Sequence, residues 1–140
     1  MSYQLNFEKF LTYNIGDEGI GLDVEIKFGE ASAKLHAKID TGATYSIFKR
    51  KFGAELGLEI ESGMRQRFGT ATGVFYGYGF RVIFITAGLE FDSMVFFAED
   101  DSFGHNVLGR IGWLDKVILG LVDYEGKLYL SHYLDEQTIL

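Results

Sequence analysis

The chain of 140 residues contains no cysteine and no proline. The absence of cysteine excludes disulfides, thiolate metal ligands and a cysteine nucleophile. No apolar run approaches the roughly 18 residues that a membrane-spanning helix needs. The first residues also lack the basic start and the apolar stretch of a signal peptide. We therefore expect a cytoplasmic protein that does not bind a membrane.

Basic residues are scarce, with 13 Lys and Arg against 20 Asp and Glu, and the formal net charge is −7. An acidic surface repels phosphate backbones, so we expect no nucleic-acid partner. The three histidines, His36, His105 and His132, are scattered along the chain without the spacing of metal ligands. The sequence predicts neither a metal site nor a cofactor.

Glycine and aromatic residues are abundant, with 18 glycines and 16% Phe, Trp and Tyr. Glycines between aromatic and β-branched runs are typical of turns between short strands. The length fits one domain, residues 1–140, without a linker or a low-complexity segment. These features favour a single all-β domain.

Hydrophobic alternation predicts most of the strands. Residues 22–28 and 35–39 alternate apolar and polar side chains, and the second run leads directly into Asp40. A hairpin with a glycine-bounded tip, residues 69–73, is expected beyond them. Further strands are expected at 81–86, 91–97, 107–109, 117–122 and 127–130. The spacing of Phe48, Phe52 and Leu56 predicts a two-turn helix, and residues 110–116 fit one more helical turn.

The most specific motif is Asp40-Thr41-Gly42-Ala43. At average residue frequencies this string occurs by chance in a few chains per thousand of this length. A second motif, Val107-Leu108-Gly109-Arg110, follows the hairpin. An ordinary Asp–Gly turn is the alternative interpretation of the first motif. The strand before it, Ala43 and the second motif disfavour that interpretation.

This order of elements resembles the retropepsin-like aspartic proteases over about residues 22–131. The resemblance implies a retropepsin-like closed β-barrel with a flap hairpin and one or two short helices. It also implies an aspartic endopeptidase that acts on a peptide or protein substrate. The absence of an acidic residue at Thr44-Tyr45, and Ile111 after Arg110, favour the cellular and bacterial branch over the retroviral one. These departures leave the partner of Arg110 open.

Aspartic proteolysis needs two carboxylates that share one proton, so that one acts as base toward water and the other as acid. The chain contains one Asp-Thr-Gly element, and its other aspartates lie in unrelated surroundings. The active form is therefore predicted to be a homodimer with one Asp40 from each protomer. In the family the terminal strands often build this interface, which makes residues 1–20 and 132–140 candidates for it.

The resemblance also assigns roles to single residues. Asp40 would be catalytic, Thr41 would make a cross-subunit hydrogen bond beneath it, and Gly42 would support the carboxylate from the backbone. The expected substrate-binding residues are Ala43, the flap tip formed by Ala71, Thr72 and Gly73, and Tyr76 on the descending arm of the hairpin, where Tyr78 could also line the cleft. The structural motif is Val107, Leu108, Gly109 and Arg110.

Two other functions remain open from the sequence. One is an inactive dimer of the same fold that binds peptides without cleaving them. The other is a small β-barrel that carries an apolar ligand, which the strand number and aromatic content would suit. An intact Asp-Thr-Gly-Ala motif disfavours the binding module, because such a module has no need of a pair of like-charged aspartates. A stable monomer at all accessible concentrations would favour the β-barrel carrier.

Overall fold

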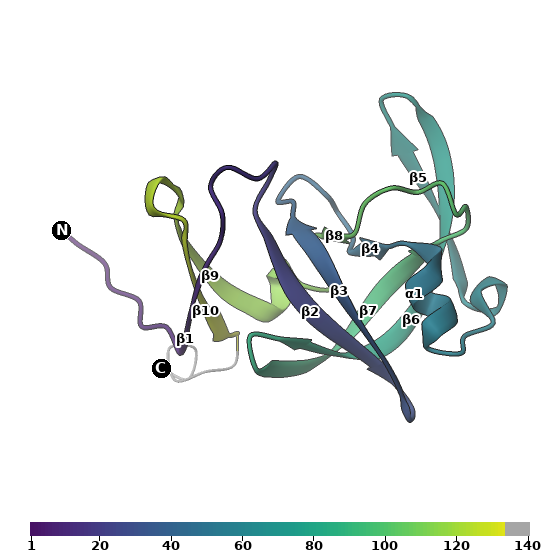
Figure 1. Cartoon of the computed structure of the whole chain (residues 1–140), viewed down its shortest axis with the longest axis horizontal. Helices are drawn as coiled ribbons and strands as arrows, with labels where there is room; N and C mark the ends of the chain where they lie inside the picture. The colour runs from purple at the N-terminus through teal and green to yellow at the C-terminus, as the bar shows by residue number, and fades with distance from the viewer. Residues whose placement is uncertain (134–140) are drawn as a thin grey trace.

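A computed structural model describes residues 1–133 of the chain (Figure 1). This part contains ten strands, one α-helix and three short 3-10 helices. The all-β class predicted from the sequence is confirmed. None of the helices in residues 1–133 has the length and apolar character needed to cross a membrane.

Seven strands form the main sheet, in the order β2-β3-β8-β4-β7-β6-β5. Strand β2 also pairs with β6, so the sheet curls back on itself. Strands β4 and β8 contribute two residues each, so the sheet is joined on that side only by short pairings and is not the fully closed barrel that was predicted. The strands are β2 (Gly21–Phe28), β3 (Ala31–Ile39), β4 (Ile47–Phe48), β5 (Met64–Thr70), β6 (Gly73–Thr86), β7 (Leu89–Ala98) and β8 (Val107–Leu108).

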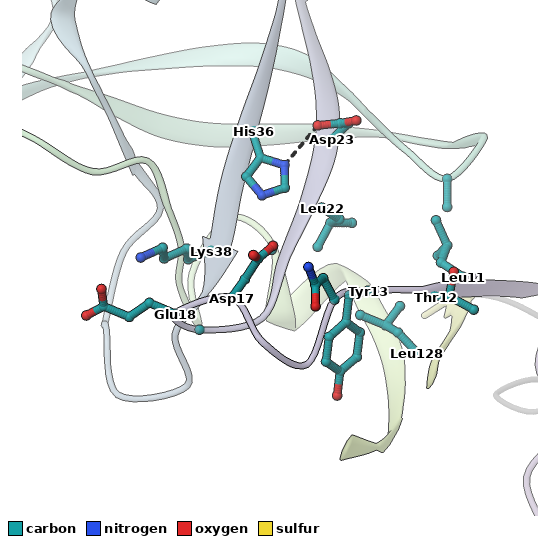
Figure 2. Close-up of a pocket in the computed structure, with 14 residues that line it drawn as sticks. Leu11, Thr12, Tyr13, Asp17, Glu18, Leu22, Asp23, His36, Lys38 and Leu128 are labelled. Atoms are coloured by element: carbon teal, nitrogen blue, oxygen red, sulfur yellow. Dashed lines mark hydrogen bonds and ion pairs between the residues drawn. The ribbon is translucent and has the colours of Figure 1, made fainter. Parts of the chain in front are cut away.

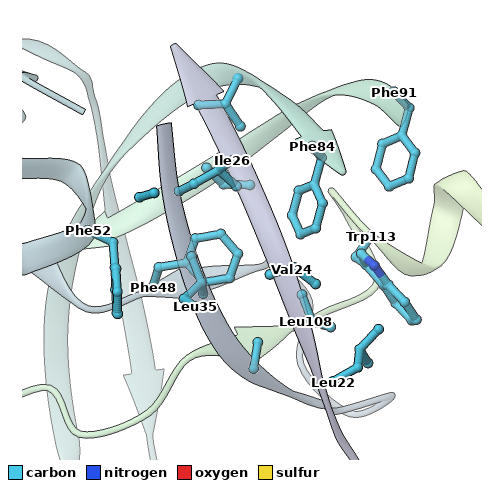
Figure 3. Packing of buried hydrophobic residues seen from close by; sticks show 14 of the residues in the cluster. Leu22, Val24, Ile26, Leu35, Phe48, Phe52, Phe84, Phe91, Leu108 and Trp113 are labelled. Carbon is cyan, nitrogen blue, oxygen red and sulfur yellow. The ribbon is translucent and has the colours of Figure 1, made fainter. Parts of the chain in front are cut away.

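The predicted alternation is present in β2 and β3. Leu22, Val24 and Ile26 are buried, whereas Asp23 between them is exposed. Their buried side faces a core that contains Phe48 and Trp113, both fully buried (Figure 3). Large aromatic side chains supply much of the apolar surface that a small domain can bury. Their abundance is therefore explained mainly by packing.

A second sheet has the order β1-β10-β9. It contains β1 (Lys9–Thr12), β9 (Val117–Val122) and β10 (Lys127–His132). The closing hairpin of β9 and β10 was predicted, and the 3-10 helix η3 (Asp123–Glu125) joins its strands. Strand β1 was not predicted, because four residues that pair with a strand more than 100 positions away leave little local pattern.

Three elements differ from the sequence prediction. Residues 74–76 and 81–86 belong to one strand, β6, which continues through Gly77 and Gly79. A Cβ at Gly79 would lie 2.8 Å from the ring of Phe96, so this glycine makes room for β7 rather than ending a strand. The helix predicted from Phe48 to Leu56 is shorter, α1 (Arg50–Glu55), because Ile47–Phe48 pairs with β7.

The third difference is the turn of helix expected over residues 110–116. Only the 3-10 helix η2 (Leu114–Lys116) forms there. Gly112 has a φ of 105°, a left-handed conformation that interrupts a regular helix. A further 3-10 helix, η1 (Ile60–Ser62), precedes β5.

Strands β5 and β6 form the predicted glycine-tipped hairpin. Thr70 pairs with Gly73, which leaves Ala71 and Thr72 as a two-residue turn. The Thr70 hydroxyl donates a 3.0 Å hydrogen bond to the carbonyl of Gly73 across the tip. In Figure 1 this hairpin projects beyond the body of the molecule.

Candidate active site

Asp40 lies directly after β3, in a loop whose conformation is fixed by backbone hydrogen bonds. Its N–H donates to the carbonyl of Leu108 at 3.0 Å, and its carbonyl accepts a 3.1 Å hydrogen bond from the N–H of Ala43. The N–H of Gly42 donates to the Oδ1 atom of Asp40 at 2.9 Å. The carboxylate is thus oriented by the chain while its residue stays exposed.

The second motif lies against this loop. Strand β8 runs parallel to the end of β3, with Leu108 opposite Ile39. Beyond β8, the N–H of Arg110 donates to the carbonyl of Ala43 at 2.9 Å, and Ile111 donates to Thr44 at 2.7 Å. The two motifs singled out in the sequence therefore form one interlocked backbone structure.

Ser46 and Gly109 join the two segments in the interior. The fully buried Ser46 hydroxyl accepts a 3.1 Å hydrogen bond from the N–H of Gly109 and donates to the carbonyl of Ile111 at 3.3 Å. A Cβ on Gly109 would collide with the backbone of Tyr45. Glycine is required here by close approach of two backbones. The sequence offers no signal for the role of Ser46.

Asn106 is a second positioning residue that the sequence did not reveal. Its buried side chain accepts a 2.9 Å hydrogen bond from the N–H of Lys49 and donates a 3.0 Å bond to the carbonyl of His36. It therefore joins β3, the start of α1 and the segment before β8. The loop of Asp40 is supported from both sides.

A cavity of about 530 Å³ lies beside Asp40. The Asp40 loop, the β5–β6 hairpin and the segment before β8 enclose it. Four aromatic rings form a connected wall: Tyr45 contacts Phe68, Phe68 stacks on Phe75 with centroids 5.0 Å apart, and Phe75 lies 5.1 Å from Phe103. The remaining lining residues are Gly42, Ala43, Thr44, Ile47, Arg67, Gly69, Thr70, His105 and Val107.

Only one of the predicted substrate-binding residues lines the cavity beside Asp40. Ala43 lines the cavity, whereas Ala71, Thr72 and Gly73 are exposed at the hairpin tip and do not line it. Tyr76 is absent from the cavity as well; its ring lies 3.9 Å from the guanidinium carbon of Arg65.

Strand geometry explains the position of Tyr76. Neighbouring residues on a strand point to opposite faces. Phe75 faces the cavity, so Tyr76 faces away from it. Tyr78 also lies outside the cavity, is 7% exposed, and donates a 2.7 Å hydrogen bond to Glu99. Glu99 raises the pKa of Tyr78 through this hydrogen bond. On the hairpin, the aromatic side chains that face the cavity are Phe68 and Phe75, and neither was predicted from the sequence to bind substrate.

Thr41 and Arg110 lie on the other side of the loop. Together with Thr44, Ile111 and the start of η2 they line a separate hollow of about 500 Å³. Within residues 1–133 the guanidinium of Arg110 has no ion-pair partner. The question of what pairs with Arg110, left open by the sequence, has no answer inside the described chain.

A different cavity, of about 540 Å³, lies between the loop before β2, the strands β2 and β3, and β10 (Figure 2). At the edge of this cavity, the Nδ1 atom of His36 lies 2.9 Å from the Oδ1 atom of Asp23, within hydrogen-bond distance. Across residues 1–133, no three His, Asp or Glu side chains are grouped as metal ligands would be. The lining of this cavity is mixed, with charged residues such as Asp17 and Lys38 beside apolar ones such as Leu22.

Residues 23–120 match the model of the aspartyl protease family, which is well over half of the chain. No similar sequence was found among curated proteins.

Two solved structures resemble the chain. EIAV protease complexed with the inhibitor HBY-793 has a TM-score of 0.55 and 21% identity, covering 71% of this chain and 88% of that one. The Simian Foamy Virus (mac) protease has a TM-score of 0.40 and 21% identity, covering 64% and 87%. The EIAV protease agrees with the fold described above. By its family match, its retropepsin-like fold and the loop that carries Asp40, the chain belongs to the aspartyl protease family.

Proposed function

We propose that the protein is a homodimeric aspartic endopeptidase in which each protomer contributes Asp40. The observation that carries this proposal is the Asp40 carboxylate itself. It is oriented by the N–H of Gly42, is exposed, and borders a cavity of side-chain size within an aspartyl protease fold. One such carboxylate per chain requires a second copy to complete the pair.

In the dimer, two Asp40 carboxylates share one proton. The ionised carboxylate takes a proton from a water molecule as the water attacks the peptide carbonyl. The protonated carboxyl stabilises the developing oxyanion, and a proton then passes to the leaving nitrogen as the C–N bond breaks. The Gly42 N–H keeps the carboxylate oriented in both states. No cofactor is required for these steps.

Exposure around the loop supports the proposed interface. Thr41, Thr44 and Arg110 are exposed, and Ile111 presents an apolar side chain that is 41% exposed. Nearby, β9 is the edge strand of its sheet in residues 1–133, and all six of its residues are uncharged and apolar or glycine. Such edges are usually covered in stable proteins.

The terminal segments were predicted from the sequence to be candidates for the dimer interface. Part of residues 1–20 forms β1 and pairs with β10 of its own chain. The other candidate segment, 132–140, lies outside the described residues from 134 onward. We therefore place the interface at the Asp40 loop, Ile111 and β9.

The proposed substrate is an extended peptide that lies beneath the β5–β6 hairpin. Backbone hydrogen bonds would hold it, and the aromatic wall would take a large apolar side chain. The hairpin would act as a flap that closes over the cleft and shields the reaction from water. A cytoplasmic location and the lack of a nucleic-acid partner stay predictions from composition.

The decisive experiment is a mass-spectrometric digest of a diverse peptide library at about pH 4–7, where a shared-proton pair can be half protonated. The wild-type protein and Asp40→Asn are compared at high protein concentration. We expect cleavage by the wild type alone. Equal cleavage by both proteins would refute the proposal.

A mixing experiment tests the shared pair. Excess Asp40→Asn is added to a fixed amount of wild type, and the mixture is allowed to exchange subunits. If each site needs one Asp40 from each protomer, activity falls as mixed dimers form. Unchanged activity would mean that one protomer is sufficient, and peptide binding without any cleavage would favour the inactive binding module.

A further inference from the structure

His105 is the one histidine among the residues that line the cavity beside Asp40. It lies in the segment that joins β7 to β8, and it is exposed. Within residues 1–133 its imidazole forms no hydrogen bond or ion pair, including none with Asp40. A polar group is thus available to a molecule that enters the cavity.

The course of this segment indicates which way the imidazole faces. Phe103, His105 and Val107 line the cavity, whereas Gly104 and Asn106 do not. The Asn106 side chain reaches the opposite side, where it contacts the backbone of His36 and Lys49. Alternate residues of an extended segment point to opposite faces. His105 therefore shares the cavity face with Phe103.

The cavity that His105 lines is mainly apolar. Phe103 is part of the aromatic wall, and its ring lies 5.1 Å from that of Phe75. Asp40, Tyr45 and Arg67 are the other titratable residues in the lining. Arg67 pairs across the hairpin with Tyr76, so its side chain leaves the strand on the face opposite Phe68 and Phe75, and the residue lines only the edge of the cavity. The imidazole is consequently the polar group best placed to contact a bound side chain.

We propose that His105 determines substrate specificity by selecting an acidic side chain two residues from the large apolar residue in the aromatic cavity, since alternate side chains of an extended peptide share one face. This inference rests on the proposed protease function and names its substrate class. A protonated imidazole presents two N–H donors and a positive charge, which suit a carboxylate. The Asp40 pair, which shares one proton and keeps one negative charge, repels a carboxylate at the cleaved bond itself, so the acidic residue is expected away from that bond.

The negative net charge of the chain means that a preference for acidic peptides has to arise from short-range contacts. A molecule with a formal charge of −7 does not attract acidic peptides over a long range. A preference for Glu or Asp must therefore come from a contact inside the cleft. Because exposed ion pairs are weak and screened, we expect about a fivefold preference for Glu over Gln at low salt, decreasing as salt is added.

The test uses three peptides that differ only in Glu, Gln or Lys at a position two residues from a Phe or Leu. His105→Gln removes the charge but keeps a hydrogen-bonding side chain. Arg67→Gln removes a charge from the edge of the cavity, and Arg81→Gln removes one from an exposed site on β6 outside it. Measurements at about pH 5 use the range in which imidazoles are mostly protonated.

Cleavage is measured as kcat/KM for the wild type and for each variant, all of which keep Asp40. We expect the Glu-to-Gln ratio to fall to about one in His105→Gln and to stay unchanged in Arg81→Gln. A ratio that survives His105→Gln, or that is lost only in Arg67→Gln, overturns the assignment to His105. Cleavage without any Glu preference in the wild type also overturns it and leaves the protease function intact.

Binding is measured separately in the Asp40→Asn background, by fluorescence anisotropy of the same peptides. A Glu preference in binding that His105→Gln abolishes, together with no cleavage by the wild type, would retain the specificity of His105 and reject the protease function. Absence of both binding and cleavage would reject both proposals.

Discussion

The hydroxyl of Tyr78 donates a 2.7 Å hydrogen bond to the carboxylate of Glu99, and this contact fastens the base of the β5–β6 hairpin to the loop after β7. The N–H of Glu99 also donates to the carbonyl of Tyr76 at 2.9 Å. Arg65 lies over Tyr76 and 3.9 Å from the Glu99 carboxylate. The hairpin is therefore anchored at its base, and motion is expected mainly nearer its tip.

Tyr78→Phe should loosen this anchor. The change removes the donor and leaves the Glu99 carboxylate without its shortest hydrogen bond. We expect the Tm to fall by a few degrees and proteolytic nicking of the hairpin to increase. Tyr124→Phe is the matched control, because the Tyr124 side chain is 94% exposed. Equal effects of the two substitutions would show that the contact contributes nothing specific.

The hydrogen bond between Tyr13 and Asp123 should make stability sensitive to alkaline pH. The Tyr13 hydroxyl donates to Asp123 at 2.6 Å, and this bond raises its pKa from 10.0 to about 12. A folded-state pKa above the unfolded value means that the protonated phenol stabilises the fold. That contribution is fully present below about pH 10 and is lost as the pH rises toward 12.

The measurement is the free energy of unfolding of wild type and Tyr13→Phe in urea, from pH 8 to about pH 12. The wild type should be more stable at pH 8, and the difference should shrink above about pH 10. A difference that grows with pH would contradict the assigned direction of the pKa shift.

Gly109→Ala should disrupt the contact between the two motifs. The new Cβ would collide with the backbone of Tyr45, which cannot move without displacing the Asp40 loop. We expect a loss of about 2 kcal/mol or more in unfolding free energy, typical of overpacking against a rigid neighbour. Gly104→Ala has open space around it and should change stability by less than about 0.5 kcal/mol. Comparable urea midpoints for both variants would refute the predicted clash.

Ser46→Ala should weaken the same junction without adding bulk. It removes the acceptor for the buried N–H of Gly109 and a donor to the carbonyl of Ile111. Leaving a buried donor unpaired costs about 1–3 kcal/mol. Because Ser46 supports the Asp40 loop without reaching the cavity, kcat should fall more than KM changes. The exposed Ser32→Ala is the control, and a wild-type kcat in Ser46→Ala would show that the loop does not need this support.

Local patterns were sufficient for much of the fold. The alternation of β2 and β3, the glycine-tipped hairpin and the closing hairpin depend on neighbouring residues, and each was predicted from them. The four-residue spacing of Phe48, Phe52 and Leu56 predicted a two-turn helix, and all three side chains are buried. It overestimated the helix because pairing of Ile47–Phe48 with β7 is a long-range contact.

The sequence by itself determined the all-β class and the two motifs, because strand alternation and the Asp-Thr-Gly-Ala string are written in consecutive residues. Tertiary structure alone decided what surrounds Asp40. Ser46 and Asn106 act through backbone groups that lie more than 50 positions away in the chain. Phe75, rather than its neighbour Tyr76, borders the cavity. The reason is physical: a one-residue step along a strand reverses the face, and only the packed hairpin fixes which face meets the site.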